Sequence, residues 1–329
     1  MNKAAIQHTK DEYGLRPEAE NFPMMVVLSF VYVCNAGCPN CPYNNSDIRQ
    51  NYKDAVLMTD EVFHRLADEC GPYGSLLRLS GGGEPMLHPK AVEHVLYALD
   101  KGCRVGLITN GSRFDETSLR TMISAGIDAI EFSVDAGDQE TYAVVRPRLD
   151  WETLNRNIRL ALDIRNELAA PTRIVTSIIN QQGVDVAAAQ EYWEKIVDKV
   201  QVRKFLTWGY NQDHSADATP YLPPEERLPC PWLFERLNVD SRGDVTLCGE
   251  DIAFANKFGN IMERSIKEIW HGPEFGHFRE LHLARRGHEI SICSTCPDWQ
   301  YRSWNYNYWK VLKDAEDKRA GAAPATVNG

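Results

Sequence analysis

The chain lacks three features that would each point to a particular class of protein. No apolar run approaches the roughly 18 residues that a membrane span needs, so we expect no membrane partner. Basic residues are not in excess: 36 Lys and Arg stand against 46 Asp and Glu, and the net charge of -10 argues against a nucleic-acid partner. No secretory leader is visible, because residues 1–20 are polar and of mixed charge. We therefore expect a cytoplasmic location, where thiols stay reduced.

What the chain does have is the composition of a folded protein and an unusual set of cysteines. Its 329 residues are 43% hydrophobic and 25% charged, which suits one large domain and a small one. Two of its nine cysteines, Cys70 and Cys103, stand alone and are expected to be packing residues. The other seven fall at spacings typical of metal sites, in two groups: Cys34, Cys38 and Cys41, and then Cys230, Cys248, Cys293 and Cys296.

Residues 24–208 alternate short apolar segments with segments of helical periodicity. The expected strands are residues 24–32, 76–80, 104–109, 129–134, 173–179 and 202–206. Six such alternations predict an α/β domain with parallel strands and right-handed crossovers. From the pattern alone, an open sheet and a partial (β/α) barrel both remain possible.

The remaining segments differ in character. We expect residues 1–23 to be a loose leader and residues 209–229, which are rich in Asp, Asn and Pro, to be a linker or a loop over a site. Residues 230–300 predict a small α+β domain containing a hairpin, with strands 237–240 and 244–247. Residues 301–329 are predicted to be an aromatic segment followed, from Asp314 onward, by a disordered tail.

The two cysteine groups differ in the number of ligands that they offer. Cys34, Cys38 and Cys41 can converge on one metal centre while leaving a coordination position that water or a cofactor must complete. The four later cysteines complete a metal site from protein alone. Their spacing leaves a structural zinc and an iron-sulfur cluster both open.

The first group resembles the cluster loop of the radical SAM superfamily, because Gly81-Gly82-Gly83-Glu84-Pro85 follows the second expected strand. This resemblance implies a partial (β/α)6 TIM-like barrel and a [4Fe-4S] cluster whose fourth iron is chelated by S-adenosyl-L-methionine (SAM). It also implies a 5'-deoxyadenosyl radical and a flavodoxin- or ferredoxin-type electron donor. Asn40 stands where the family often has an aromatic residue, and Tyr43 is the candidate to compensate. The SAM-binding residues implied by the resemblance are Gly82, Gly83, Glu84, Asn110, Ser133 and Arg146, with Ser133 assigned to the ribose and Arg146 to the carboxylate.

The second group resembles the SPASM/twitch extension of that superfamily. The matching segments are Cys230-Pro231-Trp232, Cys248-Gly249-Glu250-Asp251 and Cys293-Ser294-Thr295-Cys296. Four cysteines are fewer than a two-cluster SPASM domain carries, which favours a twitch arrangement with one auxiliary [4Fe-4S] cluster. The order and spacing of the cysteines are similar to those of twitch-type aminocyclitol dehydrogenases. That likeness implies oxidation of a secondary alcohol on a sugar or aminocyclitol to a ketone, with the auxiliary cluster as electron acceptor.

Four residues are candidates for acting on the substrate. Glu250 and Asp251 follow an auxiliary ligand and should face the gap between the clusters. Asp213 and His214 lie in the expected loop over the site and are candidate bases. Three alternatives remain: a redox-neutral epimerase, eliminase or decarboxylase on a small molecule, a peptide-modifying SPASM maturase, and a zinc-stabilised binding protein.

Overall fold

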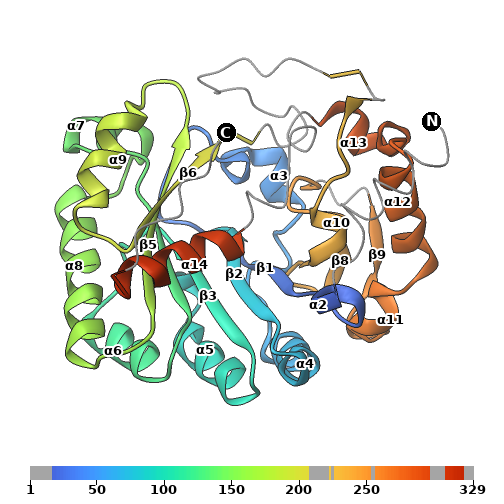
Figure 1. Cartoon of the computed structure of the whole chain (residues 1–329), viewed down its shortest axis with the longest axis horizontal. Coiled ribbons are helices and arrows are strands. Elements are labelled where there is room, and N and C mark those ends of the chain that lie inside the picture. Colours follow the sequence, from blue (N-terminus) through green and yellow to red (C-terminus); the bar gives the residue numbers. More distant parts are fainter. Residues whose placement is uncertain (1–16, 207–221, 224–225, 253–255, 297–307, 322–329) are drawn as a thin grey trace.

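The fold is organised by one nine-stranded sheet (Figure 1). The computed structural model describes residues 17–206, 222–223, 226–252, 256–296 and 308–321. The strand order is β6-β5-β4-β3-β2-β1-β7-β8-β9, and the first six strands in sequence pair in parallel. Their bounds are β1 Met25–Val31, β2 Leu76–Gly82, β3 Arg104–Thr109, β4 Ala129–Ser133, β5 Arg173–Asn180 and β6 Lys199–Lys204. The α/β class predicted from the alternation is confirmed.

Helices of the crossovers cover one face of these parallel strands (Figure 1). They are α4 Asp60–Cys70, α5 Ala91–Asp100, α6 Glu116–Ser124, α7 Gln139–Val145, α8 Trp151–Glu167 and α9 Val186–Glu194. Side-chain caps begin several of them; at α4, Thr59 Oγ1 accepts a hydrogen bond from the Val62 amide at 3.3 Å. No helix among the described residues is long and apolar enough to cross a membrane.

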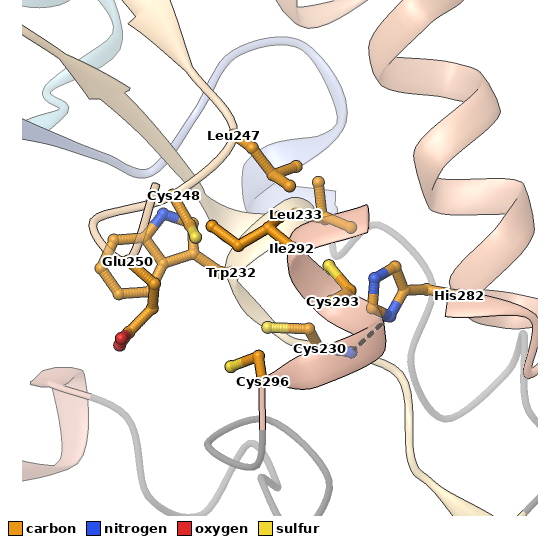
Figure 2. A pocket seen from close by; sticks show the side chains of 10 residues that line it. All are labelled: Cys230, Trp232, Leu233, Leu247, Cys248, Glu250, His282, Ile292, Cys293 and Cys296. Carbon is orange, nitrogen blue, oxygen red and sulfur yellow. Dashed lines mark hydrogen bonds between the residues drawn. The ribbon is translucent and has the colours of Figure 1, made fainter. Parts of the chain in front are cut away.

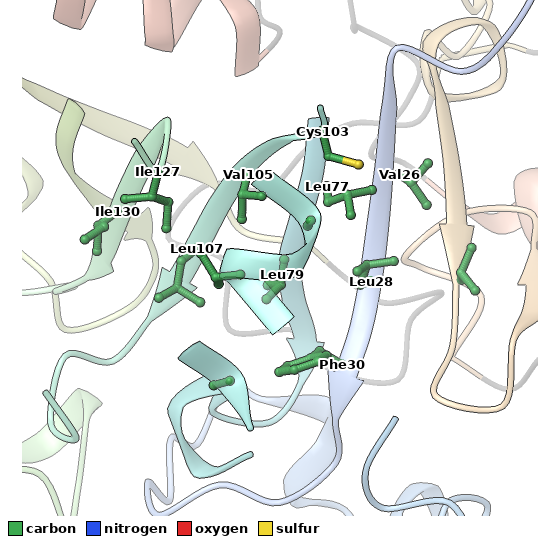
Figure 3. Close-up of a cluster of buried hydrophobic side chains, with 14 of the residues drawn as sticks. Val26, Leu28, Phe30, Leu77, Leu79, Cys103, Val105, Leu107, Ile127 and Ile130 are labelled. Carbon is green, nitrogen blue, oxygen red and sulfur yellow. The ribbon is translucent and has the colours of Figure 1, made fainter. Parts of the chain in front are cut away.

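The main core lies between these helices and the sheet (Figure 3). Alternate residues of β1, namely Val26, Leu28 and Phe30, point into it, as the two-residue period of a strand requires. Cys103 is 4% exposed there, and its thiol donates to the Ala67 carbonyl at 3.4 Å. Cys103 is therefore a packing residue, as its isolation in the sequence predicted.

The region after residue 230 continues the same sheet. Strand β7 Arg236–Val239 pairs in parallel with β1, so that Val27 lies opposite Asn238. Strand β8 Asp244–Thr246 pairs antiparallel with β7 and forms the expected hairpin, and β9 Lys257–Asn260 pairs antiparallel with β8. The helices of this region are α10 Trp232–Glu235, α11 Ile266–Trp270, α12 Pro273–Leu283 and α13 Ser291–Thr295. Shorter helices elsewhere are η1 Pro42–Asn44, α3 Ser46–Gln50, η2 Gly71–Tyr73, η3 Pro85–Leu87 and η5 Gly287–Glu289.

Two predictions about the ends of the chain are wrong within the described residues. Residues 17–23 are not a loose leader: they contain α2 Pro17–Glu20, and the Ala19 carbonyl accepts from Trp270 Nε1 at 2.9 Å. The chain after Asp314 is not disordered as far as Arg319, because it belongs to α14 Tyr308–Arg319. This helix packs its apolar side on the other face of the sheet, opposite the crossover helices.

Candidate functional site

The first three cysteines lie in the loop that follows β1, and two donors face their sulfurs. Asn110 Nδ2 lies 3.9 Å from Cys34 Sγ, and Arg146 Nη1 lies 3.6 Å from Cys38 Sγ. The Cys41 amide donates to the Cys38 carbonyl at 3.1 Å and closes the loop. The three thiols thus lie at the carboxyl end of β1, which is also the carboxyl end of the neighbouring parallel strands.

Burial sets the protonation of these thiols. It raises the pKa of Cys41 to about 11 and also raises the pKa of Cys34, so without a metal both stay protonated at neutral pH. A bound metal displaces those protons, and the Arg146 cation favours the thiolates that result. Three thiols with hydrogen-bond donors beside them fit a [4Fe-4S] cluster, whose potential is tuned by such donors.

The glycines after β2 are required by a close approach to the cysteine loop. A Cβ atom on Gly83 would lie 2.1 Å from the Val33 carbonyl oxygen, and one on Gly82 would lie 2.5 Å from the Tyr32 ring. Gly82 also has a φ of +75°, in the left-handed region that side chains disfavour. The Glu84 amide then donates to the Val33 carbonyl at 2.9 Å. The glycine loop after β2 therefore packs directly against the cysteine loop after β1.

The Glu84 side chain joins the ends of two strands. It is 2% exposed, and its carboxylate accepts from the Asn110 amide at 2.7 Å, from Thr109 Oγ1 at 2.7 Å and from the Met86 amide at 3.1 Å. Desolvation raises its pKa, although these hydrogen bonds oppose the rise. Since the carboxylate is engaged in this way, a contact with the methionyl amino group would come from the backbone of the Gly82, Gly83 and Glu84 loop.

Arg146, the residue assigned to the SAM carboxylate, forms a buried ion pair. Its Nη2 donates to Asp135 Oδ2 at 2.5 Å, and Asp135 Oδ1 accepts from the Ile179 amide at 2.8 Å. Burial disfavours the charge on Arg146, but Asp135 and Cys38 outweigh that penalty and hold its pKa above the ordinary value. Asp135 directly follows the fourth expected strand and so falls at the same end of the sheet as Ser133, but its pairing with Arg146 has no signal in the sequence.

The structure brings most of the SAM-binding candidates to one edge of the sheet. Glu84, Asn110 and Arg146 meet around the cysteine loop through the contacts above. Ser133 ends β4 on the same edge and is half-buried. The carboxyl ends of parallel strands are where such folds bind ligands.

The four later cysteines line one cavity (Figure 2). Cys230 precedes α10, Cys248 follows β8, Cys293 lies on α13 and Cys296 ends it. The other residues lining the cavity are Trp232, Leu233, Leu247, Glu250, His282 and Ile292. Burial raises the pKa of the Cys248 and Cys293 thiols well above the ordinary value.

The four thiols supply a complete set of protein ligands around one cavity. Four thiolates can hold a tetrahedral zinc or a [4Fe-4S] cluster, in which each iron takes its own thiolate. The donor set therefore fits an auxiliary [4Fe-4S] cluster, and the same four thiols would also suit zinc.

Glu250 and Asp251 have different surroundings. The Glu250 carboxylate points away from the four sulfurs (Figure 2). Glu250 lines the auxiliary cavity and is 5% exposed. Its negative charge adds to the effect of burial in raising the pKa of Cys248 and of Tyr43. Asp251 Oδ2 instead accepts from the amide and side chain of Asn256, at 2.9 and 3.3 Å, and stabilises a local turn. The candidate bases Asp213 and His214 lie outside the described residues.

A further set of contacts, which the sequence did not reveal, joins the two cysteine regions. Tyr52 stacks on Tyr32 with ring centroids 3.6 Å apart, and its hydroxyl donates to the Ile252 carbonyl at 2.8 Å. Arg242 Nη2 donates to the Asn51 carbonyl at 2.7 Å, and Ser241 Oγ to the Ala55 carbonyl at 2.5 Å. These hydrogen bonds thus join the segment that follows the cysteine loop to the β7–β8 hairpin.

Comparison with known families identifies both regions. Residues 28–178 match the radical SAM superfamily, and residues 230–297 match the SPASM iron-sulfur cluster-binding domain. The chain therefore carries a radical SAM domain followed by a SPASM domain, which supports its assignment as a radical SAM enzyme. These domains imply SAM with its [4Fe-4S] cluster and an auxiliary iron-sulfur cluster, which confirms the cofactors expected from the sequence.

Individual similar proteins include a peptide cyclase and two solved structures. The PqqA peptide cyclase of Xanthomonas campestris is 25% identical over 319 residues, covering 84% of this chain and 81% of the relative. The crystal structure of BtrN in complex with AdoMet and 2-DOIA has a TM-score of 0.56 at 18% identity, covering 86% of this chain and 97% of BtrN. Streptococcus suis SuiB bound to its precursor peptide SuiA has a TM-score of 0.64 at 13% identity, covering 92% and 74%. At these identities the two structures share the fold.

Proposed function

We propose that this enzyme oxidises a secondary alcohol of a sugar or aminocyclitol natural-product intermediate to a ketone. The observation that carries the proposal is the single cavity in which four cysteines supply one complete set of cluster ligands. A cluster ligated entirely by protein has no iron left to bind substrate, so it is suited to accept an electron. When bound, the two cofactor sites supply a 5'-deoxyadenosyl radical at the first and this electron acceptor at the second.

The conversion requires the substrate to lose a hydrogen atom from carbon, a proton from the hydroxyl and one electron. Glu250 is the residue that we assign to substrate binding, because its buried carboxylate lines the auxiliary cavity beside the cluster ligands. Asp213 and His214 stay candidates for the base that takes the proton. Asp251 is assigned a positioning role, since its carboxylate holds Asn256.

The chain's own residues would also shape the SAM site. Gly82 and Gly83 allow their loop to pack closely against the cysteine loop, and Glu84 fixes that loop against the end of β3. The Arg146 guanidinium contacts Cys38 Sγ through Nη1 and Asp135 through Nη2. The SAM carboxylate would therefore bind a guanidinium that is already oriented. We assign Ser133 and Asn110 to the same site, and a reduced flavodoxin or ferredoxin to the supply of the initiating electron.

The test uses anaerobically reconstituted enzyme and aminocyclitols deuterated at the carbinol carbon. We expect deuterium in 5'-deoxyadenosine and one ketone for each SAM cleaved. Deuterium transfer without a two-electron oxidised product would refute the dehydrogenase and favour redox-neutral chemistry. Cys248→Ala should abolish ketone formation while SAM cleavage continues, whereas Cys103→Ser, which keeps a donor for the Ala67 carbonyl, should behave as wild type.

Peptide modification is the second candidate. The observation that favours it is the likeness to PqqA peptide cyclases, which extends over 84% of the chain rather than over one domain. Its test is incubation of the same enzyme with peptides encoded beside its gene, followed by mass spectrometry for the loss of hydrogen. A modified peptide, together with unchanged aminocyclitols, would replace the first proposal by the second.

A further inference from the structure

One ionisable side chain that lines the auxiliary cavity has not yet been given a role: His282, on α12. It is 1% exposed and lines the cavity together with the four cysteines (Figure 2). His282 belongs to no short motif with the cysteines, because it lies 52 residues after Cys230 in the sequence. Its place among thiols, rather than its sequence context, makes it a candidate for a function.

The hydrogen bonding of His282 fixes its tautomer. The Cys230 backbone amide donates to His282 Nδ1 at 3.2 Å. An amide nitrogen can only donate, so Nδ1 accepts and carries no proton. A neutral imidazole holds one proton, which must then lie on Nε2. The ring therefore accepts a hydrogen bond from the backbone of one cluster ligand and carries its own proton on Nε2.

The ring is also held in place by the chain that follows α12. A Cβ atom on Gly287 would lie 2.7 Å from His282 Cε1, 2.9 Å from Nδ1 and 3.1 Å from Nε2. The backbone at Gly287 therefore packs against the Cε1 end of the ring and fixes the plane of the ring. Nδ1 accepts from the Cys230 amide, and the other ring nitrogen, Nε2, points toward the cavity that the four cysteines line (Figure 2).

We propose that His282 is a positioning and tuning residue for the auxiliary cluster: its Nδ1 anchors the backbone of Cys230, and its Nε2–H donates a hydrogen bond to a cluster sulfur. Hydrogen bonds to the sulfurs of a cluster stabilise its more negative, reduced form and raise its reduction potential. The inference depends on the auxiliary cluster alone, so it holds for either substrate class. Its failure would leave the proposed function untouched.

Two conservative variants separate the two bonds. In His282→Asn the side-chain oxygen can replace Nδ1 as acceptor for the Cys230 amide, but the side chain is too short to reach the place of Nε2. In His282→Gln an amide N–H can reach that place, but nothing replaces Nδ1. His282→Leu removes both. Each is made in a full-length background in which Cys34, Cys38 and Cys41 are Ala, so that only the auxiliary cluster is observed.

The readout is the midpoint potential of the auxiliary cluster, followed by electron paramagnetic resonance in a redox titration. We expect a shift to more negative potential for the Asn and Leu variants, and a potential near that of the parent for the Gln variant. Equal potentials in all four proteins would overturn the tuning role, as would a Gln variant that shifts as far as the Leu variant.

A second measurement does not depend on the variants holding their cluster. Protein with His282 intact is labelled with 15N-histidine, and its reduced auxiliary cluster is examined by pulsed electron paramagnetic resonance. A 15N coupling together with an exchangeable deuteron coupling in heavy water supports the hydrogen bond. Absence of any 15N-histidine coupling would overturn it.

Discussion

Replacing Glu84 by Gln tests whether this residue acts as a structural link or as a direct ligand. In wild type the carboxylate accepts three hydrogen bonds, two of them at 2.7 Å. A Gln keeps one oxygen, which can still serve Thr109 and Met86. Its NH2 group would then face the Asn110 amide, donor against donor. The substitution therefore removes a hydrogen bond and leaves a buried N–H without an acceptor.

The size of the effect follows from these losses. A hydrogen bond to a charged group is worth about 1.5–3 kcal/mol, and an unsatisfied buried donor costs about 1–3 kcal/mol. Gln is neutral, so the free-energy cost of burying a charged carboxylate is no longer present, and part of this loss is recovered. We expect the free energy of unfolding to fall by about 3 kcal/mol, and SAM affinity to fall with it, because the glycine loop loses its link to β3.

Urea unfolding and calorimetric titration with SAM provide the measurement. The matched control is Glu116→Gln on α6, where the carboxylate is 63% exposed and pairs with Arg120. A surface pair of this kind contributes about 0–1 kcal/mol, so the control should unfold nearly as wild type does. If Glu84→Gln is as stable as the control yet no longer binds SAM, the carboxylate contacts SAM directly and the reasoning above is wrong.

The remaining predictions concern packing and pH. Gly83→Ala places a Cβ 2.1 Å from the Val33 carbonyl oxygen and should cost more than about 3 kcal/mol by urea unfolding, whereas Gly276→Ala, with no atom within 4 Å, should gain about 0.5–1 kcal/mol. Equal behaviour of the two variants would contradict the clash. Burial lowers the pKa of His94 to about 4, below the roughly 6.5 of an unfolded chain, so the unfolded state binds more protons between these values. Acidification from pH 7.5 to 5 should therefore remove about 2 kcal/mol of stability, a component that His94→Gln should lack. Parallel stability curves for wild type and His94→Gln would show that another group is responsible.

The features that sequence reasoning found are those that a short segment determines by itself. The spacing of Cys34, Cys38 and Cys41, the run of glycines before Glu84 and the alternation of apolar and helical segments are all local patterns. They predict the parallel sheet and, through the family resemblance, the SAM and iron-sulfur cofactors, whereas the individual SAM-binding residues stay predictions. The hairpin of β7 and β8 was also visible, because a turn sequence lies between two short apolar segments.

The features that it missed depend on contacts between distant residues. Tyr52 and Ile252 are 200 positions apart, and no local pattern joins them. The sequence predicts disorder from Asp314 onward because the end of the chain is rich in Ala, Pro and Gly. Helix α14 nevertheless continues to Arg319, whose guanidinium donates to the carbonyls of Pro171 and Ala170 at 2.7 and 2.9 Å. His282 lies on a helix with little apolar periodicity, so its burial among cysteines follows only from the three-dimensional arrangement.

The parallel pairing of β7 with β1 has a consequence for how the two domains can be separated. All seven residues of β1 are buried, and β7 covers the edge of β1 that faces away from β2. Truncation before residue 230 would leave that edge as an open, apolar template for pairing with another chain, which is a recognised route to aggregation. The radical SAM portion is therefore not a self-sufficient module. Exchange of SPASM regions between relatives should yield soluble protein only where the incoming first strand can take the place of β7.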